Sequence, residues 1–174
     1  MNIAVLISGR GTNLQAILEA DIEVKAVVSK FTGTDQELID KLEPHNIDLV
    51  VLAGYMRILS PIFIKQYEGR IINIHPSLLP KYKGLNTHQR VIDAGDKWHG
   101  CTVHFVTEEL DAGPIIEQRR VAVLSDDTPE TLAARVLEVE HDLYPKIIKS
   151  WCAAGQIGAS KTLIEGSNPS TSAK

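Results

Sequence analysis

The chain has 174 residues, of which 44% are hydrophobic and 23% are charged, and its formal net charge is −4. Because these fractions lie close to the averages of globular domains, they exclude a chain that is disordered throughout, a collagen-like chain and a disulfide scaffold. The length fits one domain, which we place at residues 1–164, and the Ser/Gly/Pro-rich residues 165–174 are expected to form a disordered tail.

Other global properties narrow the class of protein. No apolar run approaches the roughly 20 residues that span a membrane, and the first seven residues lack the positive charge of a secretion signal. The two cysteines, Cys101 and Cys152, show no metal-ligand spacing, and no block of Lys and Arg indicates nucleic-acid binding. We therefore expect a cytoplasmic protein with reduced thiols, no metal, and neither a membrane nor a nucleic acid as partner.

The first half of the chain alternates between predicted strands and predicted helices. Residues 3–7, 24–28 and 47–52 are short aliphatic runs without alternation, which is typical of parallel strands covered on both faces. Helical spacing of apolar residues follows Thr12-Asn13 and Thr34-Asp35. This order predicts βαβ units and a parallel sheet.

The second half predicts a change of strand direction. Residues 71–74 form a short strand, and residues 87–94 a helix. Residues 99–106 and 114–123 then read as an antiparallel ribbon, before Thr128-Pro129-Glu130 opens a long helix that reaches about residue 154. The predicted class is α/β: a Rossmann-like, mostly parallel sheet with helices on both faces and an antiparallel C-terminal ribbon.

Residues 8–13, Ser-Gly-Arg-Gly-Thr-Asn, join the first predicted strand to the first predicted helix. Glycines let such a loop turn tightly and point backbone N–H groups at an anion, and Thr12 and Asn13 add side-chain donors. The loop has neither the G-x-G-x-x-G nor the Walker pattern, and it has no lysine for a triphosphate. It indicates a monophosphate site at Gly11, Thr12 and Asn13, or else an ordinary strand–helix turn.

Asn73 and His75 begin the segment Asn-Ile-His-Pro-Ser-Leu-Leu-Pro of residues 73–80. Residues two apart share one face of a strand, so these two side chains are expected to project together at the carboxyl edge of the sheet. An amide donor beside a titratable imidazole can hold a developing oxyanion and exchange a proton near neutral pH. The alternative is a polar pair that only caps the end of a strand.

Asp111 lies in the turn Asp-Ala-Gly-Pro of residues 111–114, where an aspartate most often closes its own hydrogen-bonded turn. The alternative is that Asp111 faces His75, favours the imidazolium and holds a water that shuttles protons. Spacing along the chain does not choose between these two hypotheses.

Two more segments allow both a functional and a structural interpretation. Residues 53–60 follow a buried strand and place apolar side chains where ligands of open α/β sheets bind, although a loop packed into the core explains them equally well. Glu140 and His141 lie within the predicted long helix, where a charged pair usually faces solvent. No pair of histidines has metal-ligand spacing, so no metal site is expected.

Five segments of the chain together resemble the phosphoribosylglycinamide formyltransferases, a family of the folate-dependent formyltransferase superfamily. They are residues 3–16, 50–60, 70–84, 99–114 and 138–145. The motifs Asn-Ile-His-Pro-Ser-Leu-Leu-Pro and, later, Leu-Asp-Ala-Gly-Pro are highly specific for the superfamily. The opening Ser-Gly-Arg-Gly-Thr-Asn-Leu narrows the resemblance from the superfamily to this one family. The resemblance implies the formyltransferase fold, in a monomer or homodimer. It also implies transfer of a formyl group from the co-substrate 10-formyltetrahydrofolate to the amine of glycinamide ribonucleotide, in purine biosynthesis.

The resemblance also implies how the substrates bind. The phosphate of the nucleotide would contact Gly11, Thr12 and Asn13, and Glu140 would reach its ribose or its amine. The folate would contact Met56, Arg57, Ile58, Leu59, Asn73, Val106 and Asp111.

The catalytic roles implied by the resemblance fall on three residues. Asn73 and a protonated His75 would hold the oxyanion of a tetrahedral intermediate. Asp111 would keep the imidazole charged and relay a proton through water. The family also has an unusual peptide before the last proline of its histidine motif, so we expect Leu79–Pro80 to be cis.

This chain departs from the family between Ser29 and Ile47, where it lacks one strand–helix unit. It reads Phe-Thr-Gly-Thr at residues 31–34, where relatives place an arginine near the folate. Two alternatives to formyl transfer therefore stay open. One is hydrolysis of 10-formyltetrahydrofolate by the same Asn/His/Asp set, although the hydrolases carry an N-terminal regulatory domain ahead of the first strand. The other is a catalytically idle, nucleotide-binding remnant.

Overall fold

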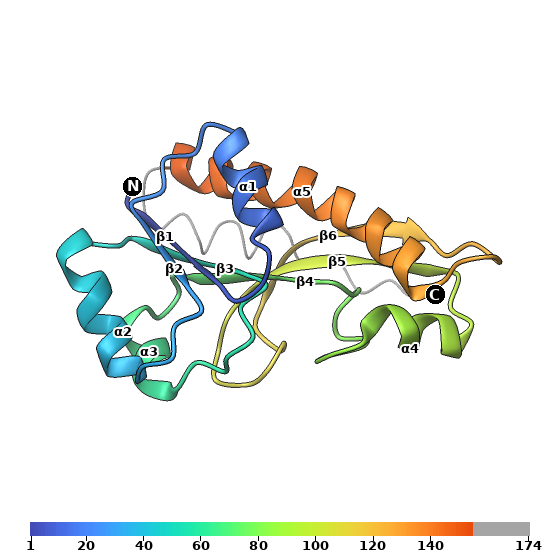
Figure 1. The fold of residues 1–174 in the computed structure, drawn as a ribbon, viewed down its shortest axis with the longest axis horizontal. Coiled ribbons are helices and arrows are strands. Elements are labelled where there is room, and N and C mark those ends of the chain that lie inside the picture. Colours follow the sequence, from blue (N-terminus) through green and yellow to red (C-terminus); the bar gives the residue numbers. More distant parts are fainter. Residues whose placement is uncertain (155–174) are drawn as a thin grey trace.

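The computed structural model describes residues 1–154 and shows a six-stranded sheet with helices on both faces (Figure 1). The strands run in the order β2-β1-β3-β4-β5-β6. They are β1 (Ile3–Ile7), β2 (Ala26–Ser29), β3 (Leu49–Ala53), β4 (Ile71–His75), β5 (Trp98–Phe105) and β6 (Ile115–Ala122). The helices are α1 (Thr12–Glu19), α2 (Asp35–Leu42), the 3-10 helix η1 (Glu43–His45), α3 (Pro61–Gln66), α4 (Thr87–Ala94) and α5 (Pro129–Ala154). The predicted α/β class is confirmed, while the tail expected at 165–174 lies outside the described residues.

The centre of the parallel half is formed by β1 and β3, in which every residue is buried. Helices α1 and α5 cover one face of the sheet and α2 and α3 cover the other (Figure 1), with a separate apolar cluster under each pair. Both sets of alternating side chains in these strands therefore face helices. This is the physical reason for their unbroken aliphatic sequences.

The edge strand β2 pairs with β1 alone and begins at Ala26 rather than at residue 24. Helix α2 and η1 are the only helices between β2 and β3, as expected for a chain that lacks one strand–helix unit. A capping box starts α2: the Thr34 hydroxyl accepts from the Glu37 N–H, and the Glu37 carboxylate accepts from the Thr34 N–H.

The antiparallel part of the sheet joins β4 to β5 and β5 to β6, as the sequence predicts. In this register Asn73 lies opposite His104, and His75 lies opposite Thr102. The alternating pattern of β5 predicts one apolar and one polar face, yet both faces are buried from His99 to Phe105. The polar side chains on β5 are therefore interior groups that need partners.

Helix α3 was not predicted, because six residues are too few to show a helical period. It has Pro61 at its first position, the place where a missing N–H has no cost. Helix α5 begins as predicted, with the Thr128 hydroxyl accepting from the Thr131 N–H at 3.2 Å, and it continues past Pro145. Within residues 1–154, no helix is both long enough and apolar enough to cross a membrane.

Candidate active site

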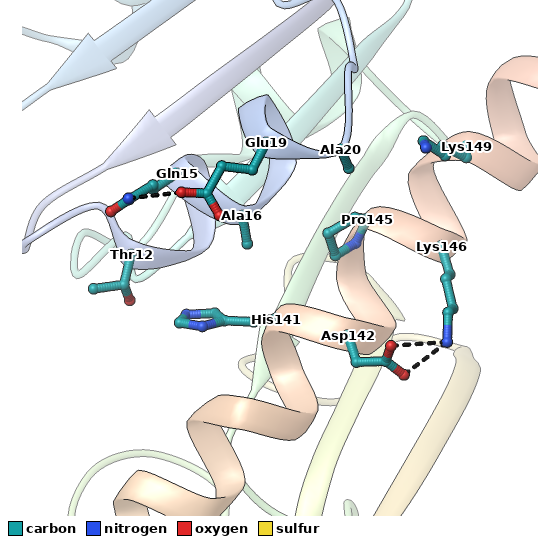
Figure 2. A pocket seen from close by; sticks show the side chains of 10 residues that line it. All are labelled: Thr12, Gln15, Ala16, Glu19, Ala20, His141, Asp142, Pro145, Lys146 and Lys149. Carbon is teal, nitrogen blue, oxygen red and sulfur yellow. Dashed lines mark hydrogen bonds and ion pairs between the residues drawn. The ribbon is translucent and has the colours of Figure 1, made fainter.

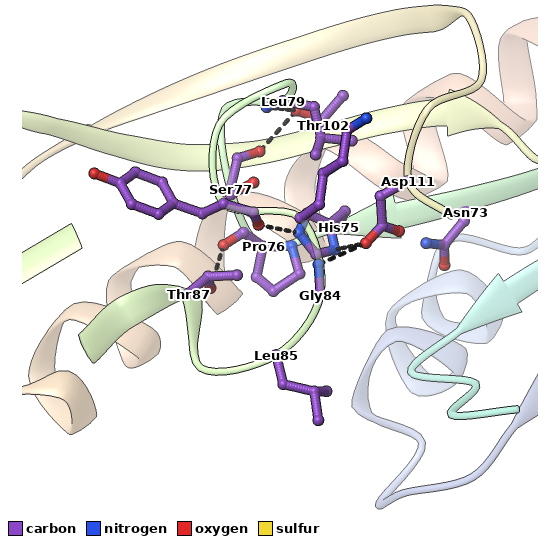
Figure 3. A network of polar contacts seen from close by, with 12 residues as sticks. Asn73, His75, Pro76, Ser77, Leu79, Gly84, Leu85, Thr87, Thr102 and Asp111 are labelled. Atoms are coloured by element: carbon purple, nitrogen blue, oxygen red, sulfur yellow. Dashed lines mark hydrogen bonds and ion pairs between the residues drawn. The ribbon is translucent and has the colours of Figure 1, made fainter. Parts of the chain in front are cut away.

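Asn73 and His75 lie on β4, where the strand reaches the carboxyl edge of the sheet, and the His75 side chain is buried. Its ring faces two acceptors (Figure 3). Nε2 lies 2.8 Å from the carbonyl oxygen of Tyr82, and Nδ1 lies 3.6 Å from Oδ2 of Asp111. Since a carbonyl can only accept, Nε2 is the donor to Tyr82, and Nδ1 is the ring nitrogen that faces the carboxylate.

Asp111 is placed against His75 by the turn between β5 and β6. Its φ of 50° lies in the left-handed region, which aspartate tolerates better than most residues. Gly113 lets the turn approach β5, because a Cβ there would lie 1.7 Å from the carbonyl oxygen of Phe105. Oδ2 of Asp111 also accepts from the N–H of Gly84 at 2.8 Å. The carboxylate is thus held between the His75 ring and the loop after β4, and not within its own turn.

The loop after β4, residues 76–86, supplies the two backbone groups that contact His75 and Asp111. The hydroxyl of Thr102 on β5 fixes this loop: it donates to the carbonyl of Ser77 at 2.7 Å and accepts from the N–H of Leu79 at 3.1 Å (Figure 3). The Leu79–Pro80 peptide is cis, as the resemblance implied. A buried polar side chain on the neighbouring strand therefore sets the position of the catalytic loop.

The predicted phosphate loop joins β1 to α1, with Gly11 as the N-cap residue at a φ of 72°. The first N–H groups of a helix have no partner inside the helix, so the loop presents donors at the carboxyl edge. Asn13 is buried beside Glu140, and its Nδ2 donates to Oε2 of Glu140 at 3.1 Å. Oδ1 of Asn13 is buried and has no partner in the described part of the chain.

Glu140 does not face solvent, so the structural interpretation of this residue was wrong. It is 6% exposed, and burial raises its pKa to about 7. Tyr144, one turn further along α5, fixes the helix in this position: its hydroxyl donates to the carbonyl of Leu52 at 2.7 Å, at the end of β3. Burial raises the pKa of Tyr144 well above 10, which keeps the hydroxyl a donor.

The residues expected to contact the folate surround a cavity of about 90 Å³ beside the catalytic residues. Its lining includes Arg57, Ile58, Leu59, Asn73, Val106 and Asp111. Met56 does not line the cavity and is 64% exposed, although its N–H donates to the Ser8 hydroxyl at 3.0 Å and so ties this segment to the phosphate loop. The Arg57 guanidinium is engaged elsewhere, since it pairs with Asp35 at 3.2 Å.

A larger cavity of about 540 Å³ lies between α1 and α5 (Figure 2). Its lining includes Thr12 and His141, but none of the residues of the smaller cavity. Size alone therefore does not mark the candidate site; the convergence of Asn73, His75 and Asp111 does. In the part of the chain that the structure describes, no group of three or more His, Cys, Asp or Glu side chains could hold a metal ion.

Sequence reasoning missed the supporting residues Tyr144, Thr102 and His104. The signal for the last two was present, because they are polar residues at alternate positions of an otherwise apolar strand. Nothing in the sequence around Tyr144 distinguishes it from an ordinary core tyrosine. Its partner is a strand carbonyl that only the tertiary structure brings near.

Comparison with known proteins places this chain in a defined family. Residues 21–148 match the family model described as formyl transferase. The phosphoribosylglycinamide formyltransferase of Escherichia coli (strain K12) is 44% identical over 190 aligned residues, which cover 90% of this chain and 89% of that protein. Since the alignment is longer than the 174 residues of this chain, that relative has additional residues within the aligned range. This agrees with the missing strand–helix unit.

Solved structures show the same relation. The phosphoribosylglycinamide formyltransferase of Coxiella burnetii, in complex with CHES, has a TM-score of 0.82 and 44% identity, covering 89% of this chain and 88% of its own. A formyltetrahydrofolate deformylase from Pseudomonas syringae has a TM-score of 0.76 and 30% identity, covering 80% of this chain and 57% of its own. The deformylase is thus the less similar of the two, both in structure and in extent.

Proposed function

Because this chain belongs to the phosphoribosylglycinamide formyltransferase family, we propose that it transfers a formyl group from 10-formyltetrahydrofolate to the amine of glycinamide ribonucleotide, in purine biosynthesis. The observation that carries the proposal is the meeting of His75 and Asp111, with Nδ1 and Oδ2 3.6 Å apart, on the sheet edge that also holds Asn73. The same three residues are the ones that the family resemblance implies.

In this proposal the amine attacks the formyl carbon, and the carbonyl oxygen becomes an oxyanion. The amide N–H of Asn73 and the His75 imidazolium stabilise this charge at the rim of the cavity. Donors that are already in position stabilise an oxyanion without reorganisation, which is where their catalytic effect arises. Because the Tyr82 carbonyl engages Nε2, we assign the contact with the reacting atoms to the Nδ1 side of the ring, which faces Asp111.

Completion of the reaction moves one proton from the attacking amine to the departing folate nitrogen. We assign this transfer to Asp111 acting through water. Its Oδ2 already accepts from the N–H of Gly84, which fixes the carboxylate beside the ring of His75. Catalytic contacts of this kind are often long in unliganded structures and shorten when the substrate binds.

The nucleotide is proposed to bind between the loop after β1 and helix α5. Backbone N–H groups at Gly11, Thr12 and Asn13 contact the phosphate, and Glu140 accepts hydrogen bonds from the ribose or the amine. The unpartnered Oδ1 of Asn13 supports this placement, because a buried acceptor without a partner carries a free-energy penalty that a ligand donor can remove.

The folate is proposed to contact Met56, Arg57, Ile58, Leu59 and Val106, together with Asn73 and Asp111. A cavity of about 90 Å³ admits only part of a folate, so the exposed side chains at its mouth complete the site. The pairing of Arg57 with Asp35 limits what its guanidinium offers to the folate, and we infer a reduced folate affinity from it.

Several broader properties are inferred along with the reaction. We place one formyltransferase domain at residues 1–164, working in the cytoplasm as a monomer or homodimer. Its partners are the two small-molecule substrates, without a nucleic acid, a membrane or a metal.

A spectrophotometric assay of tetrahydrofolate formation, run with and without glycinamide ribonucleotide, tests the proposal. Product that forms only with the nucleotide supports formyl transfer. Product that forms equally without it indicates hydrolysis. No product at micromolar enzyme indicates a nucleotide-binding remnant that has lost its activity. Either of the last two results refutes the proposed function.

A further inference from the structure

His104 is a buried histidine to which the reaction above assigns no part. It lies on β5 directly opposite Asn73 on β4 and is 2% exposed. Residues directly opposite each other in an antiparallel pair project on the same side of the sheet, so their side chains meet. Nε2 of His104 lies 3.3 Å from Nδ2 of Asn73. Both residues line the cavity that also contains Asp111.

The surroundings of His104 fix which ring nitrogen carries the proton. Nδ1 lies 2.9 Å from the backbone carbonyl oxygen of Phe105, which can only accept, so Nδ1 is the donor. Burial lowers the pKa of His104, which keeps the ring neutral. A neutral imidazole with its proton on Nδ1 presents a lone pair on Nε2. That lone pair faces the amide of Asn73.

We propose that His104 is a positioning residue that fixes the side-chain amide of Asn73 with its NH₂ group, and not its carbonyl, at the reaction centre. A lone pair on Nε2 attracts an N–H and repels a carbonyl oxygen, so only one of the two amide orientations is favourable. One N–H of Asn73 is bound to His104, and the second is left to donate to the oxyanion. This inference rests on the proposed function, because an amide turned the other way would place a carbonyl oxygen against the developing negative charge.

A pair of substitutions separates this role from a purely structural one. In His104→Asn the short amide reaches the position of Nδ1, so it keeps the donor to Phe105 and loses the acceptor for Asn73. In His104→Gln the longer amide reaches the position of Nε2, so it keeps the acceptor and loses the donor. We expect kcat to fall about 10- to 100-fold in His104→Asn, with little change in KM. His104→Gln is expected to stay within a few-fold of the original enzyme.

Combining these changes with Asn73→Ala tests whether His104 acts through Asn73. Asn73→Ala alone is expected to lower kcat about 100- to 1,000-fold, as for the loss of an oxyanion donor. Adding His104→Asn is then expected to cause no further loss, because no amide remains to be oriented. Unfolding by urea, followed by circular dichroism, verifies that each variant is folded.

The outcomes are distinct. An active His104→Asn together with an impaired His104→Gln would overturn the inference in favour of a structural role, as would equal losses with and without Asn73. Nitrogen-15 NMR of the unmodified protein at pH 7.5 is expected to show the Nδ1–H tautomer, and an Nε2–H or imidazolium signal would overturn it too. An unmodified enzyme that forms no product would instead refute the proposed function, so the two failures can be told apart.

Discussion

Replacement of Glu140 by Gln is expected to make the protein more stable at pH 8 while impairing substrate binding. Glu140 is buried, and burial raises its pKa from the usual 4.5 to about 7. Between these two values the unfolded chain loses the proton of this carboxyl while the folded chain keeps it. The free energy of unfolding therefore falls as the pH rises from 4.5 to 7, and above pH 7 the loss is complete.

The size of the effect follows from the shift. One pKa unit corresponds to about 1.4 kcal/mol, so the buried carboxylate destabilises the folded state at pH 8 by about 3 kcal/mol. Glutamine has a similar shape, stays neutral and can accept the hydrogen bond that Asn13 donates at 3.1 Å. Glu140→Gln is therefore expected to recover about 3 kcal/mol at pH 8 and almost nothing at pH 4.5, or about 6–12 °C in melting temperature at the higher pH.

Urea unfolding at pH 4.5 and pH 8, followed by circular dichroism, measures the difference. Glu138→Gln is the matched control, because Glu138 lies on the same helix but is exposed, and its effect is expected to stay within about 0.5 kcal/mol. A Glu140→Gln variant that gains the same stability at both pH values, or that loses stability at pH 8, would refute the reasoning. A raised KM for glycinamide ribonucleotide in the same variant would indicate that the charge is retained for binding, at the expense of stability.

Three further predictions concern the catalytic histidine, a buried histidine and the turn that carries Asp111. His75→Ala is expected to lower the rate of formyl transfer at least about 100-fold, and near-normal rates in the product assay would dismiss its role. Burial lowers the pKa of His99 to about 4. Between pH 6.5 and pH 4 the unfolded chain therefore takes up a proton while folded His99 stays neutral, so the free energy of unfolding decreases as the pH is lowered. His99→Gln is expected to flatten this acid-side loss in urea unfolding; an unchanged slope would contradict it. Gly113→Ala places a methyl group 1.7 Å from the Phe105 carbonyl oxygen, so we expect the free energy of unfolding to fall by roughly 1–3 kcal/mol and the activity to fall as well. A stable, fully active variant would contradict the role given to this turn.

Several features of the fold were predictable from the sequence because they depend on local chemistry. The aliphatic runs that became β1 and β3, the helix at Thr87–Ala94 and the start of α5 at Thr128-Pro129 all follow from periodicity, burial and capping. Helix α3 was not predicted because a stretch of six residues is too short to show a helical period. The start of β2 was predicted too early, at residue 24. An edge strand begins only where its single neighbour pairs with it, here at Ala26 opposite Ala4, and the sequence of β2 does not record this.

The candidate site, like the fold, was only partly predictable from the sequence. The sequence alone singled out Asn73 and His75 at the end of a strand and Asp111 in a later turn, and it identified the family to which they point. The tertiary structure decided that Asp111 lies beside His75, that Glu140 turns inward to Asn13, and that His104 stands opposite Asn73. Residue types and spacing fix the chemistry that a side chain can perform. Which side chains meet depends on strand order, register and helix packing, which arise from interactions between segments that are distant in the chain.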